Sequence, residues 1–362
     1  MSDAIRHFSQ HKLNGTTLQV VADAEEGLSR LVDAEIAVIR AFSAAGGFPH
    51  RRVTLFVLSD LTLLAAQIER LSAVPAVVVR ELGGRPMVNI YDAADPDECT
   101  VFVNRGEIVR EGLWLDALAL TGLLAHEHGH PLAECRSVAA VRGLSLAVRV
   151  DGEDDVDAPA PGVADALSAL LGKLSIRAPQ EVLANEAAIR VGLGDALARL
   201  DERQLALTRV AVDRRPELVA MLDRQVAEGR LSPARRAGLL LIGDMQTTLP
   251  FALEIAPFAR AGRPGVTARL ESLLVDGILA RLPDVLTALY HDLRDHYVVL
   301  SATMPATVAA DWCRRAAGYV VAPLQASGLT VEVTIATTPA SAGSNAAAAT
   351  AGGAAHRGGS SR

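Results

Sequence analysis

The sequence predicts an α+β protein, in which a small mixed sheet packs on a helix and a mainly helical region follows. Short β-branched runs are confined almost entirely to the first third of the chain, whereas residues 201–297 follow helical periodicity nearly throughout. Of the 362 residues, 50% are apolar but only 4% are aromatic. Such a composition, rich in Ala, Leu and Val, favours closely packed helices over an aromatic-rich β-sandwich.

The first third combines strand and helix patterns. Residues 17–45 show helical periodicity, which a glycine pair and a proline at 46–49 end. The run VTLFVL at 53–58 predicts a buried strand, and a helix is expected at 62–71. Three further strands are predicted, at 77–79, 87–91 and 100–104.

The pattern becomes helical from Glu111 and continues to His130. Residues 138–150 are apolar without a clear period, and the acidic segment 151–162 is expected to be a solvated connection. Two helices and a strand are predicted beyond it, at 163–174, 180–200 and 330–337. We therefore expect a first domain over 1–200, a helical subdomain over 201–337 and a disordered Ala/Gly/Ser-rich tail over 338–362.

Charge and cysteine content exclude several classes of protein. Lys and Arg total 35 against 42 Asp and Glu, and no basic run with interleaved aromatic residues occurs, so no nucleic-acid partner is expected. The N-terminus lacks an apolar signal segment and no run of 18 apolar residues occurs, so we expect a cytoplasmic protein without a membrane partner. Three scattered cysteines are too few for a disulfide framework or a thiolate zinc knuckle. The sequence leaves the oligomeric state open.

The stretch LLAHEHGHPL contains the metal-binding pattern HExxH, formed by His126, Glu127 and His130. Two histidines four residues apart on a helix lie about 40° from each other around its axis, so both imidazoles reach one Zn²⁺ ion. Glu127 projects beside the ion, where a carboxylate takes a proton from an activated water. His128 points away from this face and is expected to be a packing or surface residue. Pro131 is expected to end the helix at His130.

A third metal ligand is expected from the chain after His130. Ala133 and Arg136 stand where the pattern HExxHxxGxxH needs Gly and His. On the helix predicted at 180–200, Glu186 lies in an apolar stripe, where a carboxylate is costly unless a metal compensates it. The alternative for Glu186 is an i,i+4 ion pair with Arg190, and Glu181 is a weaker candidate ligand.

His126-Glu127-xx-His130, followed on a later helix by Asn185-Glu186, resembles the gluzincin zinc metallopeptidases. The resemblance covers about residues 85–200 and implies a zincin-like fold, with Zn²⁺ held by His126, His130 and Glu186 and with Glu127 as general base. It also implies that Gly129 lets a neighbouring backbone approach the helix. An edge strand before the helix, at 87–91 or 100–104, is then expected to pair with extended substrate.

The predicted function is therefore hydrolysis of an intracellular peptide or protein by a zinc metallopeptidase. The alternative is a catalytically silent binding or regulatory protein with the same zincin-like fold, which uses its helical half for interactions. A di-iron site is disfavoured because the chain offers no second ExxH. Four residues of the segment LYHDLRDHY are weak candidates to stabilise the oxyanion, namely Tyr290, His291, His296 and Tyr297.

Overall fold

The computed structural model describes residues 7–13, 15–71, 74–82, 84–150 and 162–337. Its contacts divide the chain into two compact units. Among the described residues, the first unit comprises those up to Ala133 together with Leu183–Arg203, and the second comprises those from Glu134 to Val182 and from Gln204 to Thr337. The predicted α+β class is confirmed, because a mixed five-stranded sheet is followed by a mainly helical region.

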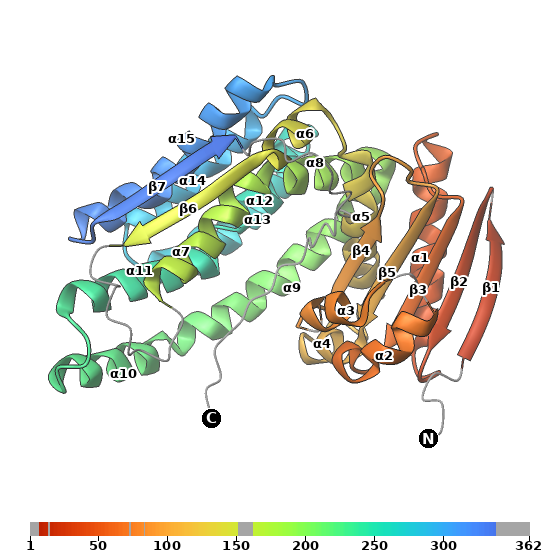
Figure 1. The fold of residues 1–362 in the computed structure, drawn as a ribbon, viewed down its shortest axis with the longest axis horizontal. Helices are drawn as coiled ribbons and strands as arrows, with labels where there is room; N and C mark the ends of the chain where they lie inside the picture. Colours follow the sequence, from red (N-terminus) through yellow and green to blue (C-terminus); the bar gives the residue numbers. More distant parts are fainter. Residues whose placement is uncertain (1–6, 14, 72–73, 83, 151–161, 338–362) are drawn as a thin grey trace. The chain divides into compact units, whose positions relative to one another are not determined.

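The first unit is built on the five-stranded sheet, whose order is β1-β2-β3-β5-β4 (Figure 1). β2, β3 and β5 are parallel, whereas β1 and β4 are antiparallel strands at the two edges. The strands are β1 (His7–Leu13), β2 (Thr16–Ala22), β3 (Arg52–Leu58), β4 (Met87–Tyr91) and β5 (Glu98–Asn104). The helices of this unit are α1 (Leu28–Ala44), α2 (Leu61–Leu71), α3 (Ala76–Leu82), α4 (Arg105–Arg110) and α5 (Ala117–Leu132).

The two faces of the sheet bury different side chains. On one face, Val21, Phe56 and Phe102 form a row across three strands and pack with apolar residues of α2 and α3. Neighbouring residues along a strand point to opposite faces, so the adjacent row, which includes Val101 and Asn89, faces the other way. This second face meets α5, which in turn packs along α1. The sheet therefore presents β4 and β5 directly to the helix that carries HExxH.

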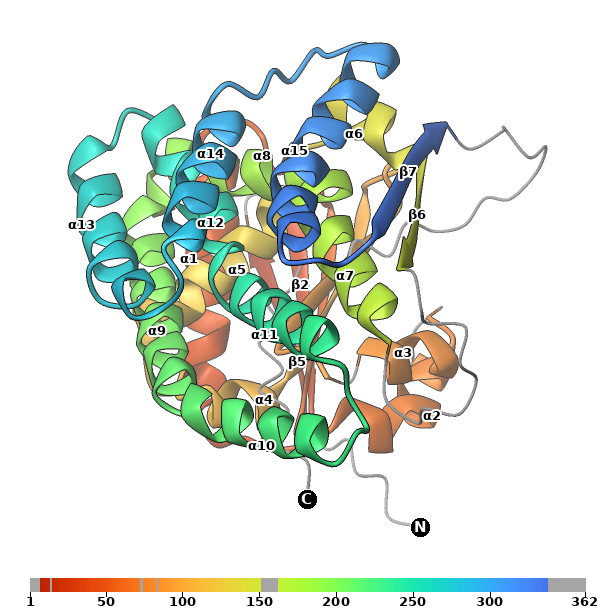
Figure 2. The ribbon, with the colours of Figure 1, turned by 90° about the vertical axis from the view of Figure 1, so that its left-hand side faces the viewer.

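The second unit is mainly helical, and α12, α13 and α14 lie side by side in it (Figure 2). Its helices are α6 (Arg136–Arg142), α7 (Val163–Leu171), α10 (Arg215–Ala227), α11 (Pro233–Thr248), α12 (Phe251–Arg260), α13 (Pro264–Val275), α14 (Val285–Val298) and α15 (Ala306–Ala326), with a π-helical turn at Gly172–Ile176 and a 3-10 turn at Leu279–Arg281. β6 (Leu144–Val150) and β7 (Val331–Thr337) form an antiparallel ribbon beside α15 and α7.

α8 (Ala178–Ala188) and α9 (Gly194–Asp213) each have residues in both units. A π-helical turn at Ile189–Leu193 joins them, and Gly192 in this turn has a φ of 93°. Glycine adopts a positive φ without the steric penalty of a Cβ, so Gly192 allows the kink between the two helices. The end of α8 and the beginning of α9 therefore belong to the first unit, and the kink at Gly192 lies between them.

Several sequence predictions are corrected by the structure. Residues 77–79, predicted as a strand, lie in α3, and the beginning of the helical segment predicted at 17–45 is the strand β2. β1 was not predicted. The acidic segment at 151–161 and the tail at 338–362 lie outside the described residues.

Among the described residues, one helical stretch, Pro233–Arg260, is long and apolar enough to cross a membrane. It has a mean hydropathy of 1.2 over its best window, and 67% of that window is buried inside the protein. A buried core helix of a globular protein gives the same signature.

Candidate metal centre

The helix α5 carries the predicted metal ligands, and Asp116 fixes where it begins. The Asp116 carboxylate accepts a hydrogen bond from the Ala119 N–H at 3.1 Å, as an N-cap residue does. Arg199 and Arg203 of α9 each donate to the same carboxylate at 2.9 Å. Partial burial raises the pKa of Asp116, but the Ala119 N–H and the two guanidinium groups outweigh it and lower the pKa overall. This cap therefore also ties α9 to the start of the helix.

His126 and His130 lie together on one face of α5, as the spacing predicts. One donor atom from each, together with a carboxylate oxygen of Glu127, lies within 4.8 Å of the others. The two imidazole centroids are 4.7 Å apart, and His130 is buried whereas His126 is half-buried. Two imidazole nitrogens and one carboxylate oxygen of α5 are therefore close enough together to surround one metal ion.

His126 is oriented by a side chain of α8. Its Nδ1 lies 2.7 Å from Oδ1 of Asn185, and an amide oxygen only accepts, so Nδ1 is the protonated nitrogen. The lone pair of a neutral His126 is then on Nε2. Metal-binding histidines are held in this way, with the second ring nitrogen donating to a neighbouring oxygen.

Gly129 allows α8 to approach this face of α5. A Cβ at Gly129 would lie 2.3 Å from the backbone oxygen of Ala184, the residue before Asn185. Gly122, two turns earlier, makes an equivalent approach to the backbone oxygen of Ala196 on α9, also at 2.3 Å. The prediction that Gly129 lets a neighbouring backbone approach the helix is therefore confirmed. Gly122 allows the same close approach by α9.

Glu127 is fully buried beside the edge strand β4. Its Oε2 accepts a hydrogen bond from the backbone N–H of Asn89 at 3.1 Å. Of the two strands considered for substrate pairing, Met87–Tyr91 lies at the sheet edge, whereas Glu98–Asn104 is paired on both sides. The outward N–H of Asn89 is therefore committed to the Glu127 carboxylate.

Pro131 does not end α5 at His130 as predicted, because the helix continues to Leu132. A proline has no N–H to donate to the carbonyl four residues earlier, here that of Glu127. Nδ2 of Asn89 donates to this carbonyl instead, at 3.0 Å. Asn89 thus supplies the hydrogen bond that Pro131 cannot make, and it holds both the backbone and the carboxylate of Glu127.

Glu186 lies on α8 next to Asn185, and its side chain is mostly buried. Its Oε1 accepts from Nε of Arg190 at 3.0 Å and from Nη2 at 2.5 Å, which is the i,i+4 pair considered as the alternative. Glu186 is not among the residues whose donor atoms converge with those of His126 and His130. Glu181 lies in the first turn of α8. As the third ligand, Glu186 stays a prediction.

A second group of donor atoms was missed by sequence reasoning. His50, Cys99 and His128 are buried, and one donor atom from each lies within 4.8 Å of the others. His128 does point away from His126 and His130, as predicted. The three residues are far apart in the sequence and follow no metal-binding spacing, so no local pattern could have found them. Burial, followed by the neighbouring His128, lowers the pKa of His50 to about 4, against the opposing hydrogen bond to Pro96.

The four weak oxyanion candidates lie in the second unit, and three of them are buried there. The Tyr290 hydroxyl donates to Glu271 at 3.2 Å, and the Tyr297 hydroxyl donates to the Leu174 carbonyl at 2.6 Å. His296 stacks on Trp312 with centroids 4.4 Å apart. These side chains contribute to packing and hydrogen bonding within their own unit.

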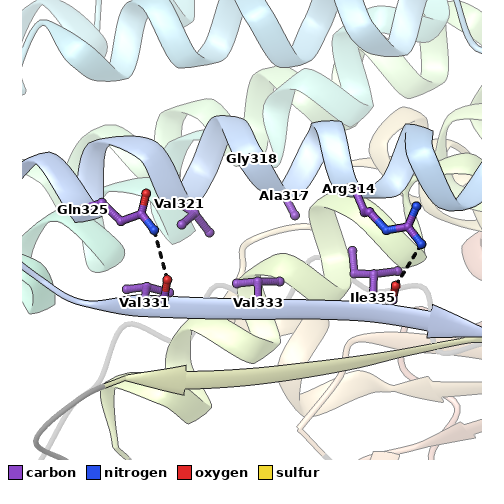
Figure 3. Close-up of a pocket in the computed structure, with 8 residues that line it drawn as sticks. All are labelled: Arg314, Ala317, Gly318, Val321, Gln325, Val331, Val333 and Ile335. Atoms are coloured by element: carbon purple, nitrogen blue, oxygen red, sulfur yellow. Dashed lines mark hydrogen bonds between the residues drawn. The ribbon is translucent and has the colours of Figure 1, made fainter.

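A groove in the second unit lies between α15 and β7 (Figure 3). Its volume is about 270 Å³, and its walls are mostly small and β-branched side chains. Two polar side chains at its ends, Arg314 and Gln325, donate to the backbone carbonyls of Ile335 and Val331. The groove therefore offers no residue set comparable with that on α5.

No protein-family model, curated protein or solved structure matches this chain.

Proposed function

We propose that this chain is a zinc-dependent metallopeptidase of the gluzincin type, with a zincin-like first unit, that hydrolyses peptide bonds in a cytoplasmic peptide or protein. The observation that carries the proposal is the convergence of His126, His130 and the Glu127 carboxylate on one helix. A binding site needs the two imidazoles, but it has no need of a buried carboxylate held beside them. The carboxylate therefore favours catalysis.

The donor set suits Zn²⁺. One type of catalytic zinc site uses two imidazole nitrogens and one carboxylate as its protein ligands and keeps one position open. His126 is already oriented by Asn185 with its lone pair on Nε2. In the proposal, His126 and His130 hold the ion and Glu186 is the third ligand. Glu186 then exchanges its contact with Arg190, which is an exposed side chain, for the metal.

When bound, Zn²⁺ polarises the amide carbonyl and lowers the pKa of water at the site. Glu127 accepts the proton from the attacking water and passes it to the leaving amine. The hydrogen bond from the Asn89 N–H keeps one oxygen of the Glu127 carboxylate in place. In the proposal, the other oxygen, Oε1, carries the proton.

The sheet supports the proposal through its edge strand. β4 is antiparallel to β5, lies at the edge of the sheet and contacts α5. This is the strand that the gluzincin resemblance expects next to the active-site helix. In the proposal, extended substrate pairs with backbone groups of β4 other than the N–H of Asn89.

The test compares Glu127→Gln with His126→Ala in the full-length protein. We expect Glu127→Gln to keep its zinc but to lose about 10²–10⁴-fold in peptidase activity, the usual contribution of a general base. His126→Ala should lose the activity and the zinc ion that His126 and His130 hold. His11→Ala, which alters a histidine of the edge strand β1 outside both groups of donor atoms, is the matched control and should keep both. Metal analysis and hydrolysis of a fluorogenic peptide library measure these effects.

Turnover that survives in Glu127→Gln would remove the general-base role. A wild-type protein that holds zinc on His126 and cleaves no peptide would favour the alternative, a catalytically silent binding protein. Glu186 is tested separately. Glu186→Gln should weaken zinc binding, whereas Arg190→Ala should not. Unchanged zinc affinity in Glu186→Gln would exclude Glu186 from the ligand set.

A further inference from the structure

The first unit contains a second group of potential metal ligands, on the other side of α5. His50 precedes β3, Cys99 is in β5 and His128 is in α5. All three are at most 2% exposed, and one donor atom of each lies within 4.8 Å of the others. Cys99 occupies a β5 position on the α5 side of the sheet, two residues before Val101. Three separate parts of the chain therefore bring their donor atoms to one buried point.

Both imidazoles of this group are held through a single nitrogen. Nδ1 of His50 lies 2.5 Å from the Pro96 carbonyl oxygen, and Nε2 of His128 lies 2.7 Å from Oε1 of Glu35 on α1. A carbonyl and a carboxylate accept, so these two nitrogens are the protonated ones. The opposite nitrogens, Nε2 of His50 and Nδ1 of His128, are buried and have no hydrogen-bond partner among the residues that the structure describes.

This arrangement matches the way proteins orient metal-bound histidines. In metal sites the imidazole usually donates its second N–H to a carboxylate or a backbone carbonyl, which fixes the ring and leaves the other nitrogen for the ion. A buried polar atom without a partner is otherwise costly, and here each of the two imidazoles near the Cys99 thiol has one such nitrogen. A cation bound by these two nitrogens would satisfy both.

We propose that His50, Cys99 and His128 supply three ligands of a second Zn²⁺ site, in which Glu35 and the Pro96 carbonyl orient the two imidazoles. Two nitrogens and a sulfur are ligands that zinc favours. Binding converts the Cys99 thiol to a thiolate and releases its proton to solvent. The thiolate and the Glu35 carboxylate together offset the double charge of the ion. The site fastens α5 to β5 and to the segment that leads into β3.

Cobalt substitution tests this proposal, because a thiolate bound to Co²⁺ gives a near-ultraviolet charge-transfer band. The group around His126 and His130 contains no sulfur, so this band reports the second site alone. Metal-free full-length protein titrated with Co²⁺ should develop the band, and the band should saturate by two ions per chain, of which one is bound by the thiolate. Cys99→Ser should abolish it. Cys313→Ser, which alters the other buried cysteine, is the matched control and should keep it.

The outcomes separate this proposal from the proposed function. His126→Ala should abolish peptidase activity and keep the thiolate band, and the zinc content should fall from two ions per chain to one in either His126→Ala or Cys99→Ser. A wild-type protein that binds Co²⁺ without a thiolate band would overturn the second site, and this measurement needs no variant to fold. A band that persists in Cys99→Ser would also overturn it. Absence of peptidase activity would leave it standing.

Discussion

Asn89 is not itself a candidate metal ligand, but it makes three hydrogen bonds to residues of the two groups of donor atoms. Its side chain donates to the Glu127 carbonyl, its backbone donates to the Glu127 carboxylate, and its Oδ1 accepts from the Cys99 thiol at 2.8 Å. The first of these hydrogen bonds compensates for the missing N–H of Pro131. A residue between the two groups of metal ligands therefore also makes the proline tolerable inside α5.

Replacing Asn89 should reveal this compensation in a double-mutant cycle with Pro131. Asn89→Ala removes the Nδ2 donor from the buried Glu127 carbonyl and should lower the free energy of unfolding by about 1–3 kcal/mol. In a Pro131→Ala background residue 131 has an N–H again, so the same change should cost less. Urea unfolding of the metal-free proteins measures the four stabilities. Costs that simply add would show that the two residues are not coupled.

At the scale of elements, the glycines of α5 set its distance from α8. A methyl group at Gly129 would collide with the Ala184 carbonyl, so α8 must shift and carry Asn185 away from His126. Gly129→Ala should therefore lower the free energy of unfolding by about 1–3 kcal/mol and weaken zinc binding. Gly243→Ala, in α11, is the matched exchange into open space and should be neutral or stabilising by up to about 1 kcal/mol. Thermal unfolding and metal titration distinguish the two, and equal effects would contradict the packing role.

The same elements show what local sequence reveals. Three strands of the sheet were predicted within about two residues of their bounds, because each is a short buried run between turn residues. The strand predicted at 77–79 was wrong, because three consecutive valines satisfy a strand pattern and also fit one apolar turn of α3. The predicted end of α5 at His130 was wrong for another reason. The partner that replaces the proline's missing N–H comes from β4, far away in the sequence, and no helix rule includes it.

At the scale of the whole molecule, local sequence again reveals one group of donor atoms and misses the other. HExxH could be recognised because both histidines lie on one helix, whereas the group of His50, Cys99 and His128 exists only once the sheet has formed. The two units are also assembled from alternating stretches of the chain, with α8 and α9 shared between them. Continuous helical periodicity predicts helices there but contains no information about which unit each half joins.

The second unit should lose stability in mild acid through His296. Burial, together with the nearby Arg315, lowers the pKa of His296 to about 4 from 6.5, and the hydrogen bond to the Trp312 carbonyl only partly opposes this. Between these two pH values the unfolded chain binds a proton that the folded chain does not, so the free energy of unfolding falls as the pH is lowered through this window. Allowing for partial solvent screening, the loss is on the order of 1 kcal/mol.

Trp312 stacks on His296 and reports the transition by its fluorescence in a Trp114→Phe background. His296→Gln, which does not titrate, should flatten the pH dependence between 6.5 and 4.5, since most carboxylates titrate below this range. An unchanged slope in that variant would place the acid sensitivity of this unit elsewhere.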